Sequence, residues 1–283
     1  MIGTEFKDIE SYNQKMTGSM GDKLFFINKL SPLDNYIFVD FGCADGTLIK
    51  TLYGIYGDSC RYVGYDKSKE MIDFAKKNFE EVINHDEVRF TNDWIDVVAA
   101  IRGERAWGRK PVLILSSVIH EIYSYGTEKD IQEFWCRALD HDPASITFDD
   151  DRFDYIIVRD MMMSEDMMRP SDAETVEKIR NSSGKIRGLL NRFEAKWGKI
   201  DYTNQMIHFL LKYRYTINYD REVNENYFPL TIEEFMGKFE SGWRLDYLER
   251  FRILFLEKQI LKDFGIVLED PTHIKAIFRR KNV

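Results

Sequence analysis

The stretch YIFVDFGCADGT at residues 36–47 decides the fold that we expect. Its first six residues are mostly aromatic or β-branched, which predicts a short buried strand. The run stops at Gly42, and helical spacing of apolar side chains begins at Thr47. Small residues let a backbone approach a ligand closely, and the first N–H groups of a helix have no partner inside it. The stretch therefore predicts a strand, a glycine turn and a helix, with a ligand site at the turn.

Short apolar runs and helical patterns alternate along the chain as far as residue 160. We expect strands at residues 61–65, 88–90, 111–115 and 153–159, with helices at residues 69–79, 94–101 and 128–139. Strands joined by helices of this length form parallel sheets through right-handed crossovers. The predicted fold class is α/β, with a Rossmann-like, mostly parallel seven-stranded sheet, helices on both faces and an inserted helical cap.

The pattern divides the chain into four regions. Helical patterns without a parallel-type strand fill the third region, and a helix at 231–239 with strand-like runs at 243–252 and 272–278 fills the fourth. The regions are an N-terminal lid helix at 1–30, a core at 31–160, a cap at 161–230, and a C-terminal helix with closing strands at 231–283.

Composition excludes several classes of protein. The 283 residues are 44% hydrophobic with a formal net charge of −8, which excludes intrinsic disorder. No run of eighteen apolar residues occurs, so we expect no membrane span. The cysteines, Cys43, Cys60 and Cys136, form no C-x-x-C pair, and the first residues do not read as a secretory signal. We therefore expect a cytoplasmic protein without a metal site.

Polar residues follow each of the next strands at the edge where the turn lies. Asp66 ends the second strand, and a carboxylate there can accept hydrogen bonds from the two hydroxyls of a ribose. It can equally cap the helix that follows, and both interpretations stay open. Asn92, Asp93 and Trp94 follow the third strand, and Ser116 and Ser117 follow the fourth. Together these positions predict an adenosine site.

At these residues the chain resembles the class I S-adenosylmethionine-dependent methyltransferases. The resemblance rests on VDFGCADG at 39–46, VGYDKS at 63–68, TNDW at 91–94 and SSVIHEIYSYG at 116–126, and it covers roughly residues 10 to 160. It implies that S-adenosyl-L-methionine is the cofactor and that the chain is a transferase. The implied cofactor-binding residues are Tyr12, Lys23, Asp40, Gly42, Ala44, Asp45, Gly46, Asp66, Lys67, Met71, Asn92, Asp93, Trp94, Ser116 and Ser117.

The turn departs from the family pattern at one position, where Ala44 replaces the usual middle glycine. A nicotinamide dinucleotide is the competing ligand for such a turn, but its G-x-G-x-x-G pattern would require glycine at Ala44 and Thr47. Asp45 would also repel the phosphates of a dinucleotide. S-adenosylmethionine carries no phosphate, so it is the ligand that we expect.

Methyl transfer is an in-line displacement that depends chiefly on holding two reactants in line. His120 follows the fourth strand, near the expected position of the methyl group, and is the candidate general base. The alternative is that His120 only orients its loop or packs against the cofactor. Arg159 and Asp160, at the end of the fifth strand, are candidates to grip the substrate. The expected substrate-binding residues are His120, Glu121, Arg159, Tyr215 and Arg221.

The cap carries a local excess of positive charge. Seven Lys or Arg residues and one acid, Glu194, lie between residues 178 and 199. They indicate either an anionic acceptor or an ordinary solvated face over a packed helix. We expect a small-molecule acceptor first and an RNA second, while a partner subunit that binds the cofactor without catalysis is the third alternative. We expect no membrane partner, and the sequence does not indicate an oligomeric state.

Overall fold

Seven strands form one sheet in the computed structural model, which describes residues 20–31, 34–79, 87–139 and 152–281. The strand order is β3-β2-β1-β4-β5-β7-β6. The first five strands pair in parallel, and β7 pairs antiparallel with both β5 and β6. The strands are β1 Tyr36–Phe41, β2 Arg61–Tyr65, β3 Val88–Thr91, β4 Lys110–Ser116, β5 Tyr155–Met161, β6 Trp243–Phe251 and β7 His273–Arg280. The mostly parallel, Rossmann-like seven-stranded sheet is therefore confirmed, and with it the fold that the methyltransferase resemblance implied.

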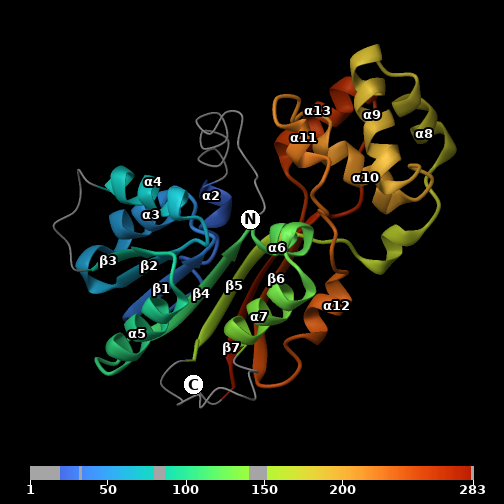
Figure 1. Cartoon of the computed structure of the whole chain (residues 1–283). Helices are drawn as coiled ribbons and strands as arrows, with labels where there is room; N and C mark the ends of the chain where they lie inside the picture. Colours follow the sequence, from blue (N-terminus) through green and yellow to red (C-terminus); the bar gives the residue numbers. More distant parts are fainter. Residues whose placement is uncertain (1–19, 32–33, 80–86, 140–151, 282–283) are drawn as a thin grey trace.

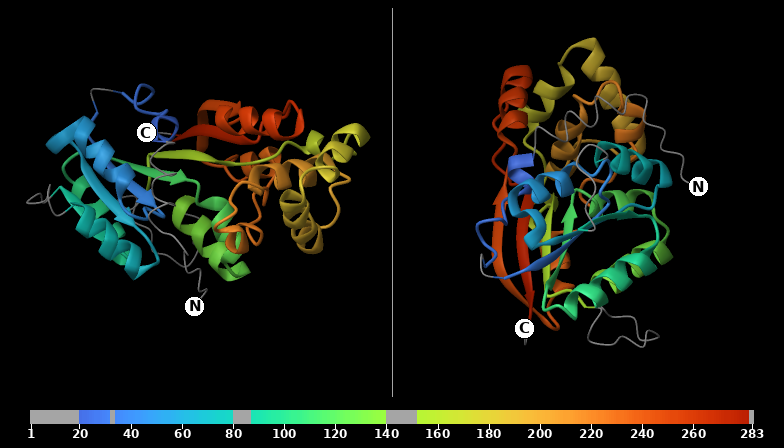
Figure 2. Two further views of the ribbon diagram at one scale, coloured as in Figure 1. Left: turned by 90° about the horizontal axis from the view of Figure 1, so that it is seen from above. Right: turned by 90° about the vertical axis from the view of Figure 1, so that its left-hand side faces the viewer.

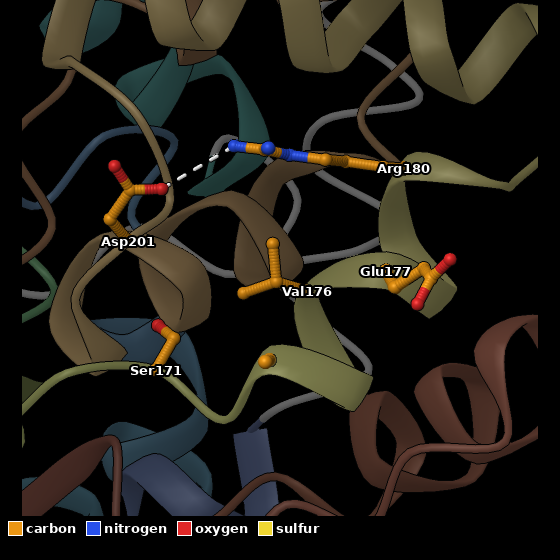
Figure 3. Close-up of a pocket in the computed structure, with 6 residues that line it drawn as sticks. Ser171, Val176, Glu177, Arg180 and Asp201 are labelled. Atoms are coloured by element: carbon orange, nitrogen blue, oxygen red, sulfur yellow. Dashed lines mark hydrogen bonds and ion pairs between the residues drawn. The ribbon is translucent and has the colours of Figure 1, made fainter.

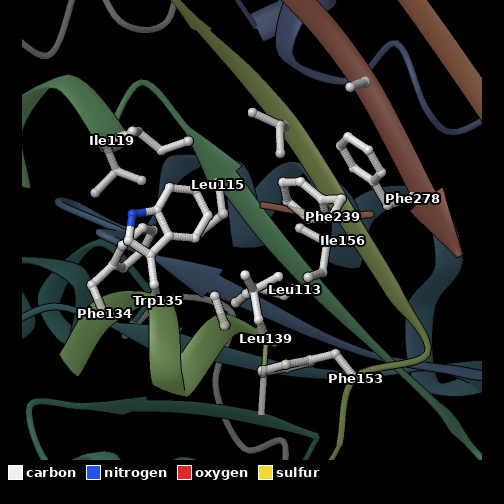
Figure 4. Packing of buried hydrophobic residues seen from close by; sticks show 14 of the residues in the cluster. Leu113, Leu115, Ile119, Phe134, Trp135, Leu139, Phe153, Ile156, Phe239 and Phe278 are labelled. Carbon is white, nitrogen blue, oxygen red and sulfur yellow. The ribbon is translucent and has the colours of Figure 1, made fainter. Parts of the chain in front are cut away.

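Helices cover both faces of this sheet (Figure 1). On one face lie α2 Met20–Lys23, α3 Thr47–Tyr56 and α4 Lys69–Phe79, packed on a core that includes Phe26, Leu52 and Phe79. The other face is covered by α5 Trp94–Arg105, α6 Ile119–Tyr125, α7 Glu128–Leu139 and α12 Ile232–Gly237. The second core contains Leu113, Phe134 and Trp135 and continues to Phe239 and Phe278 of the last region (Figure 4).

The strands lie where the sequence placed them because a parallel strand covered on both faces is an almost continuous apolar run. In β4 the five residues from Pro111 to Leu115 are buried, and β5 is buried from Tyr155 to Asp160. Helix α4 has the expected bounds, and so has α7. Helix α6 was not expected, since its seven residues are too short to show a helical period.

A separate layer of helices lies beyond the edge of the sheet where the strand β5 ends (Figure 2). Its own core is built around Met167, Phe193 and Phe209, and it also includes Ile260 and Phe264 from the segment between β6 and β7. The helices of this cap are η3 Glu165–Met168, α8 Ala173–Arg180, α9 Gly184–Trp197, α10 Thr203–Lys212, α11 Tyr219–Glu222 and α13 Leu254–Phe264. Outside the cap, a short helix η1 Gly57–Ser59 follows α3. Within the described residues, no helix has the length and hydrophobicity of a membrane span.

Candidate cofactor and acceptor site

The glycine turn after β1 has a left-handed backbone at three positions. The φ angles are +78° at Gly42, +47° at Ala44 and +75° at Gly46. A Cβ atom built on Gly42 would lie 2.7 Å from Cγ2 of Val118, so this glycine is required both by its backbone and by its neighbour. Ala44 adopts the conformation that a glycine would adopt more readily, which shows how the departure from the family pattern is accommodated.

Asp66 connects the end of β2 to this turn. Its Oδ2 accepts the backbone N–H of Ala44 at 3.1 Å, and its Oδ1 accepts the N–H of Ser68 at 2.8 Å. Burial raises the pKa of Asp66, while these two hydrogen bonds oppose the rise. The cap of α4 is Ser68, whose Oγ accepts the N–H of Met71 at 3.3 Å, while Asp66 holds the N–H of Ser68 and fixes the glycine turn. Each carboxylate oxygen can accept a second hydrogen bond, so the expected ribose contact stays a prediction.

A small hollow lies between α2 and the glycine turn. Lys23 and Asp40 line it, and both are buried. Burial lowers the pKa of Lys23 to about 8 and raises the pKa of Asp40 to about 7, with each group's charge favouring the charged form of the other. Ser116 also lines the hollow, and its buried Oγ has no hydrogen-bond partner among the described residues. The other lining residues are Met20, Gly42, Cys43, Ala44, Asp45, Thr47 and Leu48.

The residues after β3 have local roles in this structure. Asp93 caps α5 by accepting the N–H of Ile95 at 2.9 Å, and Asn92 is exposed. The ring of Trp94 packs against Phe41 and Tyr65, with centroids 5.7 and 5.2 Å away. The expected adenine contacts of these three residues therefore stay predictions.

The remaining cofactor candidates lie in different surroundings. Lys67 is exposed and forms an ion pair with Asp130 at 3.1 Å, whereas Met71 is buried on α4. Asp45 accepts the N–H of Thr47 at 3.1 Å. Ser117 has a φ of +60° directly after β4. Tyr12 lies outside the described residues.

The side chain of His120 is held in place by Asp160, which lies near the end of β5. The Nδ1 of His120 lies 2.7 Å from Oδ1 of Asp160, and both side chains are buried. The carboxylate also accepts the backbone N–H groups of Ile119 and Met161 at 2.7 and 2.8 Å. Burial alone would lower the pKa of His120, but Asp160 and nearby glutamates raise it to about 9. The general-base role of His120 stays a prediction.

The cap brings further charged groups to His120. Arg221 donates to Oε1 of Glu121 at 2.7 Å and lies 3.1 Å from Oε1 of Glu225. Oε2 of Glu225 lies 3.8 Å from Nε2 of His120, and the hydroxyl of Tyr125 donates to Oε1 of Glu225 at 3.1 Å. Three of the five expected substrate residues, His120, Glu121 and Arg221, therefore lie in one cluster at the end of β4.

Arg159 and Tyr215 lie at the edge of this cluster. The guanidinium of Arg159 forms an ion pair with Asp22 at 3.0 Å and donates to Oγ of Ser117 at 2.9 Å. Burial raises the pKa of Tyr215, as do Glu222 and Glu225, while Arg159 lowers it. Arg159 thus connects α2 to the loop after β4 through these two contacts. The binding of a substrate by Arg159 stays a prediction.

The sequence did not indicate two residues of the site, Asp22 and Glu225. Asp22 joins two strands to α2, because its carboxylate contacts Lys275 of β7 at 2.5 Å as well as Arg159 of β5. Glu225 faces His120 from a segment far along the chain. Neither residue follows one of the predicted parallel strands, so no local pattern marked them.

The cap has a hollow of its own between α8 and the start of α10 (Figure 3). Val176, Glu177 and Arg180 line it on one side, with Ser171 and Asp201 opposite, and Arg180 lies 3.4 Å from Asp201. None of the expected site residues lines this hollow. It is therefore separate from the strand ends where the site residues gather.

No protein-family model matches the sequence, and no curated protein matches it. Solved structures that resemble this fold include a SAM-dependent methyltransferase from Aquifex aeolicus, at 10% identity and a TM-score of 0.44 over 97% of this chain and 98% of that one. The cyclopropane synthase MmaA2 from Mycobacterium tuberculosis has 11% identity and a TM-score of 0.49, over 92% and 84% of the two chains. The small RNA methyltransferase HEN1 has 15% identity and a TM-score of 0.46, over 100% of this chain and 27% of that one. Because every one of these scores is below 0.5, the fold assignment rests on the strand order and the turn geometry.

Proposed function

We propose that this protein is an S-adenosylmethionine-dependent methyltransferase that acts on a small-molecule acceptor. The observation that carries the proposal is the glycine turn held by Asp66 beside a hollow lined by Lys23 and Asp40. The turn lies outside the carboxyl end of β1, where open α/β sheets bind their ligands. A turn that contains Asp45 suits a cofactor without phosphates better than a dinucleotide.

The residues present fit this cofactor. Gly42, Ala44 and Asp45 of the turn line the hollow, and Ser116 Oγ is a buried hydroxyl whose hydrogen-bonding capacity is unused. Lys23 would hold the methionine carboxylate and Asp66 the ribose hydroxyls, with the adenine near Asp93 and Trp94. The bound cofactor would supply an activated methyl group on a positively charged sulfur.

Side chains of this protein would orient the acceptor and take up the proton that it loses. The cluster of His120, Glu121 and Arg221 lies next to the loop after β4, so an acceptor bound there would be close to the hollow. Cap residues cover this cluster, and Glu225 is buried against it. Exclusion of water and alignment of the reactants are the main sources of rate enhancement that such an enclosed site offers.

The charges of the cap favour a small acceptor over RNA. Lys178, Arg180 and Arg192 each form ion pairs with acids of the cap, which reduces the positive field of α8 and α9. An anionic acceptor is also less favoured, because Glu121, Glu222 and Glu225 all approach the cluster around His120. Methylation of RNA is the second candidate function, since Lys185, Lys196 and Lys199 add charge to the same layer. A partner subunit that binds the cofactor without catalysis is the third.

Calorimetric titration with S-adenosylmethionine, with NAD⁺ as the control ligand, is the first test. We expect micromolar binding of S-adenosylmethionine and none of NAD⁺. Methyl-labelled cofactor is then offered with a small-metabolite extract and, separately, with total RNA at increasing salt. Label in the metabolite fraction supports the proposal, salt-sensitive label in RNA favours the second candidate, and binding without transfer to either favours the third. Failure to bind the cofactor contradicts all three.

A further inference from the structure

The hollow between α8 and the start of α10, here called the cap hollow, is not explained by the proposed function (Figure 3). Its volume is about 450 Å³, within the range of roughly 300–1,000 Å³ that small-molecule sites occupy. Its lining shares no residue with the hollow beside the glycine turn. A ligand bound in the cap hollow would therefore be distinct from the proposed cofactor.

Both walls of the cap hollow are held in place by the fold of the cap. The α8 wall consists of four side chains on one face of that helix: Ala173, Val176, Glu177 and Arg180. Ile179, on another face of α8, is fully buried in the core of the cap. The facing wall is joined to the start of α8, because the carbonyl oxygen of Asp201 accepts the N–H of Ser171 at 2.8 Å. The two walls are therefore fixed relative to each other.

One side of the cap hollow carries a buried hydroxyl with unused hydrogen-bonding capacity. The Oγ of Ser171 has no hydrogen-bond partner among the described residues. Buried polar atoms in folded proteins are normally satisfied by protein, by water or by a ligand. A hydroxyl both donates and accepts, so Ser171 can accept a hydrogen bond from a ligand that enters beside Asp201.

The charges of the cap hollow favour a cation. Its lining contains two carboxylates, Glu177 and Asp201, against one guanidinium, that of Arg180. Nη2 of Arg180 also lies 3.3 Å from Glu194, so the positive charge of Arg180 is opposed twice. An anion would therefore meet an excess of carboxylates. The pair of Arg180 with Asp201 is 3.4 Å long with side chains 45% and 58% exposed, so it contributes little and a ligand can replace it.

We propose that the cap hollow binds an aliphatic diamine. The two carboxylates lie on either side of Val176, with Asp201 on one wall and Glu177 on the other (Figure 3). One ammonium group would bind Asp201 and the Oγ of Ser171, and the other would bind Glu177. The alkyl chain between them would pack on Ala173 and Val176, as the stem of a lysine packs on an apolar surface. The site goes beyond the proposed function, because it requires neither the cofactor nor a methyl acceptor.

The first test compares three ligands of similar length and different charge. The full-length protein is titrated by calorimetry, without cofactor, with 1,4-diaminobutane, 1-aminobutane and succinate. We expect saturable binding of the diamine that weakens with added salt, roughly tenfold weaker binding of the monoamine, and none of the dianion. No saturable binding of the diamine, equal affinity for the monoamine, or binding of succinate would each overturn the proposal.

The second test places the diamine in the cap hollow. Glu177→Gln and Asp201→Asn should each weaken its binding roughly tenfold. The matched control is Glu174→Gln on the same helix, because Glu174 pairs with Lys178 and does not line the hollow. Unchanged affinity in either lining variant, or an equal loss in the control, would show that the diamine binds elsewhere and overturn the proposal.

The third measurement separates a ligand-binding serine from a structural one. Ser171→Ala should weaken diamine binding roughly two- to tenfold. The same change should not lower the unfolding midpoint of the free protein, because the hydroxyl has no partner to lose among the described residues. A lower midpoint with unchanged diamine affinity would contradict the place of Ser171 in the site. Cofactor affinity should be equal in all these variants and the wild type, so failure of the proposed function would not affect this result.

Discussion

The Asp66 carboxylate accepts the backbone N–H of Ala44 at 3.1 Å, so the acid at the end of β2 fixes the turn at the end of β1. Ala44 holds a left-handed conformation, with φ of +47°, that an L-residue adopts at a cost. The hydrogen bond helps to offset this cost. The shape of the turn and the proposed ribose contact therefore depend on the same side chain.

Replacing Asp66 with alanine should weaken S-adenosylmethionine binding roughly ten- to a hundredfold. The estimate follows from charge-assisted hydrogen bonds worth about 1.5–3 kcal/mol. Calorimetric titration measures the change in Kd. The matched control is Asp172→Ala in the cap, where Asp172 caps α8 by accepting the N–H of Thr175 at 2.8 Å. Equal affinity in the Asp66 variant and the wild type would mean that Asp66 only holds the N–H groups of Ala44 and Ser68 and so shapes the two turns.

Replacing Gly42 with alanine should destabilise the protein by about 2–4 kcal/mol. The added Cβ meets Val118 at 2.7 Å, and the backbone has a φ of +78°, so strain and overpacking add together. Urea unfolding measures the change in the free energy of unfolding. Gly188, inside α9, has nothing within 4 Å of its Cβ position, and Gly188→Ala should stabilise by about 0.5–1 kcal/mol. Similar effects at the two glycines would show that the turn is more adaptable than its geometry indicates.

Replacing Asp22 with asparagine should cost about 1–3 kcal/mol of stability and weaken cofactor binding. The change removes the charge that holds Arg159 and Lys275, and Asp22 adjoins Lys23 of the cofactor hollow. Urea unfolding and calorimetry measure the two effects. Asp73→Asn is the control, because its pair with Lys69 is exposed and should contribute less than about 0.5 kcal/mol. If Asp22→Asn and Asp73→Asn lower the free energy of unfolding by the same small amount, the Asp22 contacts do not hold α2 in place.

The parts of this fold that the sequence predicted are those with a local signal. A strand such as β4 is apolar along its length because both faces are covered, and α4 shows the helical period over eleven residues. The glycine turn was also predictable, since Gly42 and Gly46 mark a backbone that few other residues adopt.

The parts that escaped prediction depend on contacts between distant segments. Glu225 meets His120 only because the cap folds back over α6, and nothing near Glu225 in the sequence indicates this contact. Asp22 is placed by cations on β5 and β7 in the same way. The protonation state of His120 could not be predicted either, because a pKa depends on burial and neighbouring charges in the folded state.

The stability of the protein should carry a pH dependence that originates at His120. Its pKa rises from the usual 6.5 to about 9 on folding, so the native state binds the proton more tightly. The stabilisation is fully present below about pH 6.5 and is lost as the pH rises through about 9. The stability difference between wild type and His120→Gln should therefore be largest at the acidic end of this window and should narrow towards pH 9.

His273 is the matched control for that experiment. Burial lowers its pKa well below 6.5, with Arg159, His120 and Lys275 adding to the effect, so His273 is neutral in the folded protein throughout the same window. The difference between wild type and His273→Gln should therefore stay constant above about pH 6.5. Urea unfolding of the three proteins at a series of pH values measures both curves. A constant difference for His120→Gln as well would show that Asp160 does not hold an imidazolium.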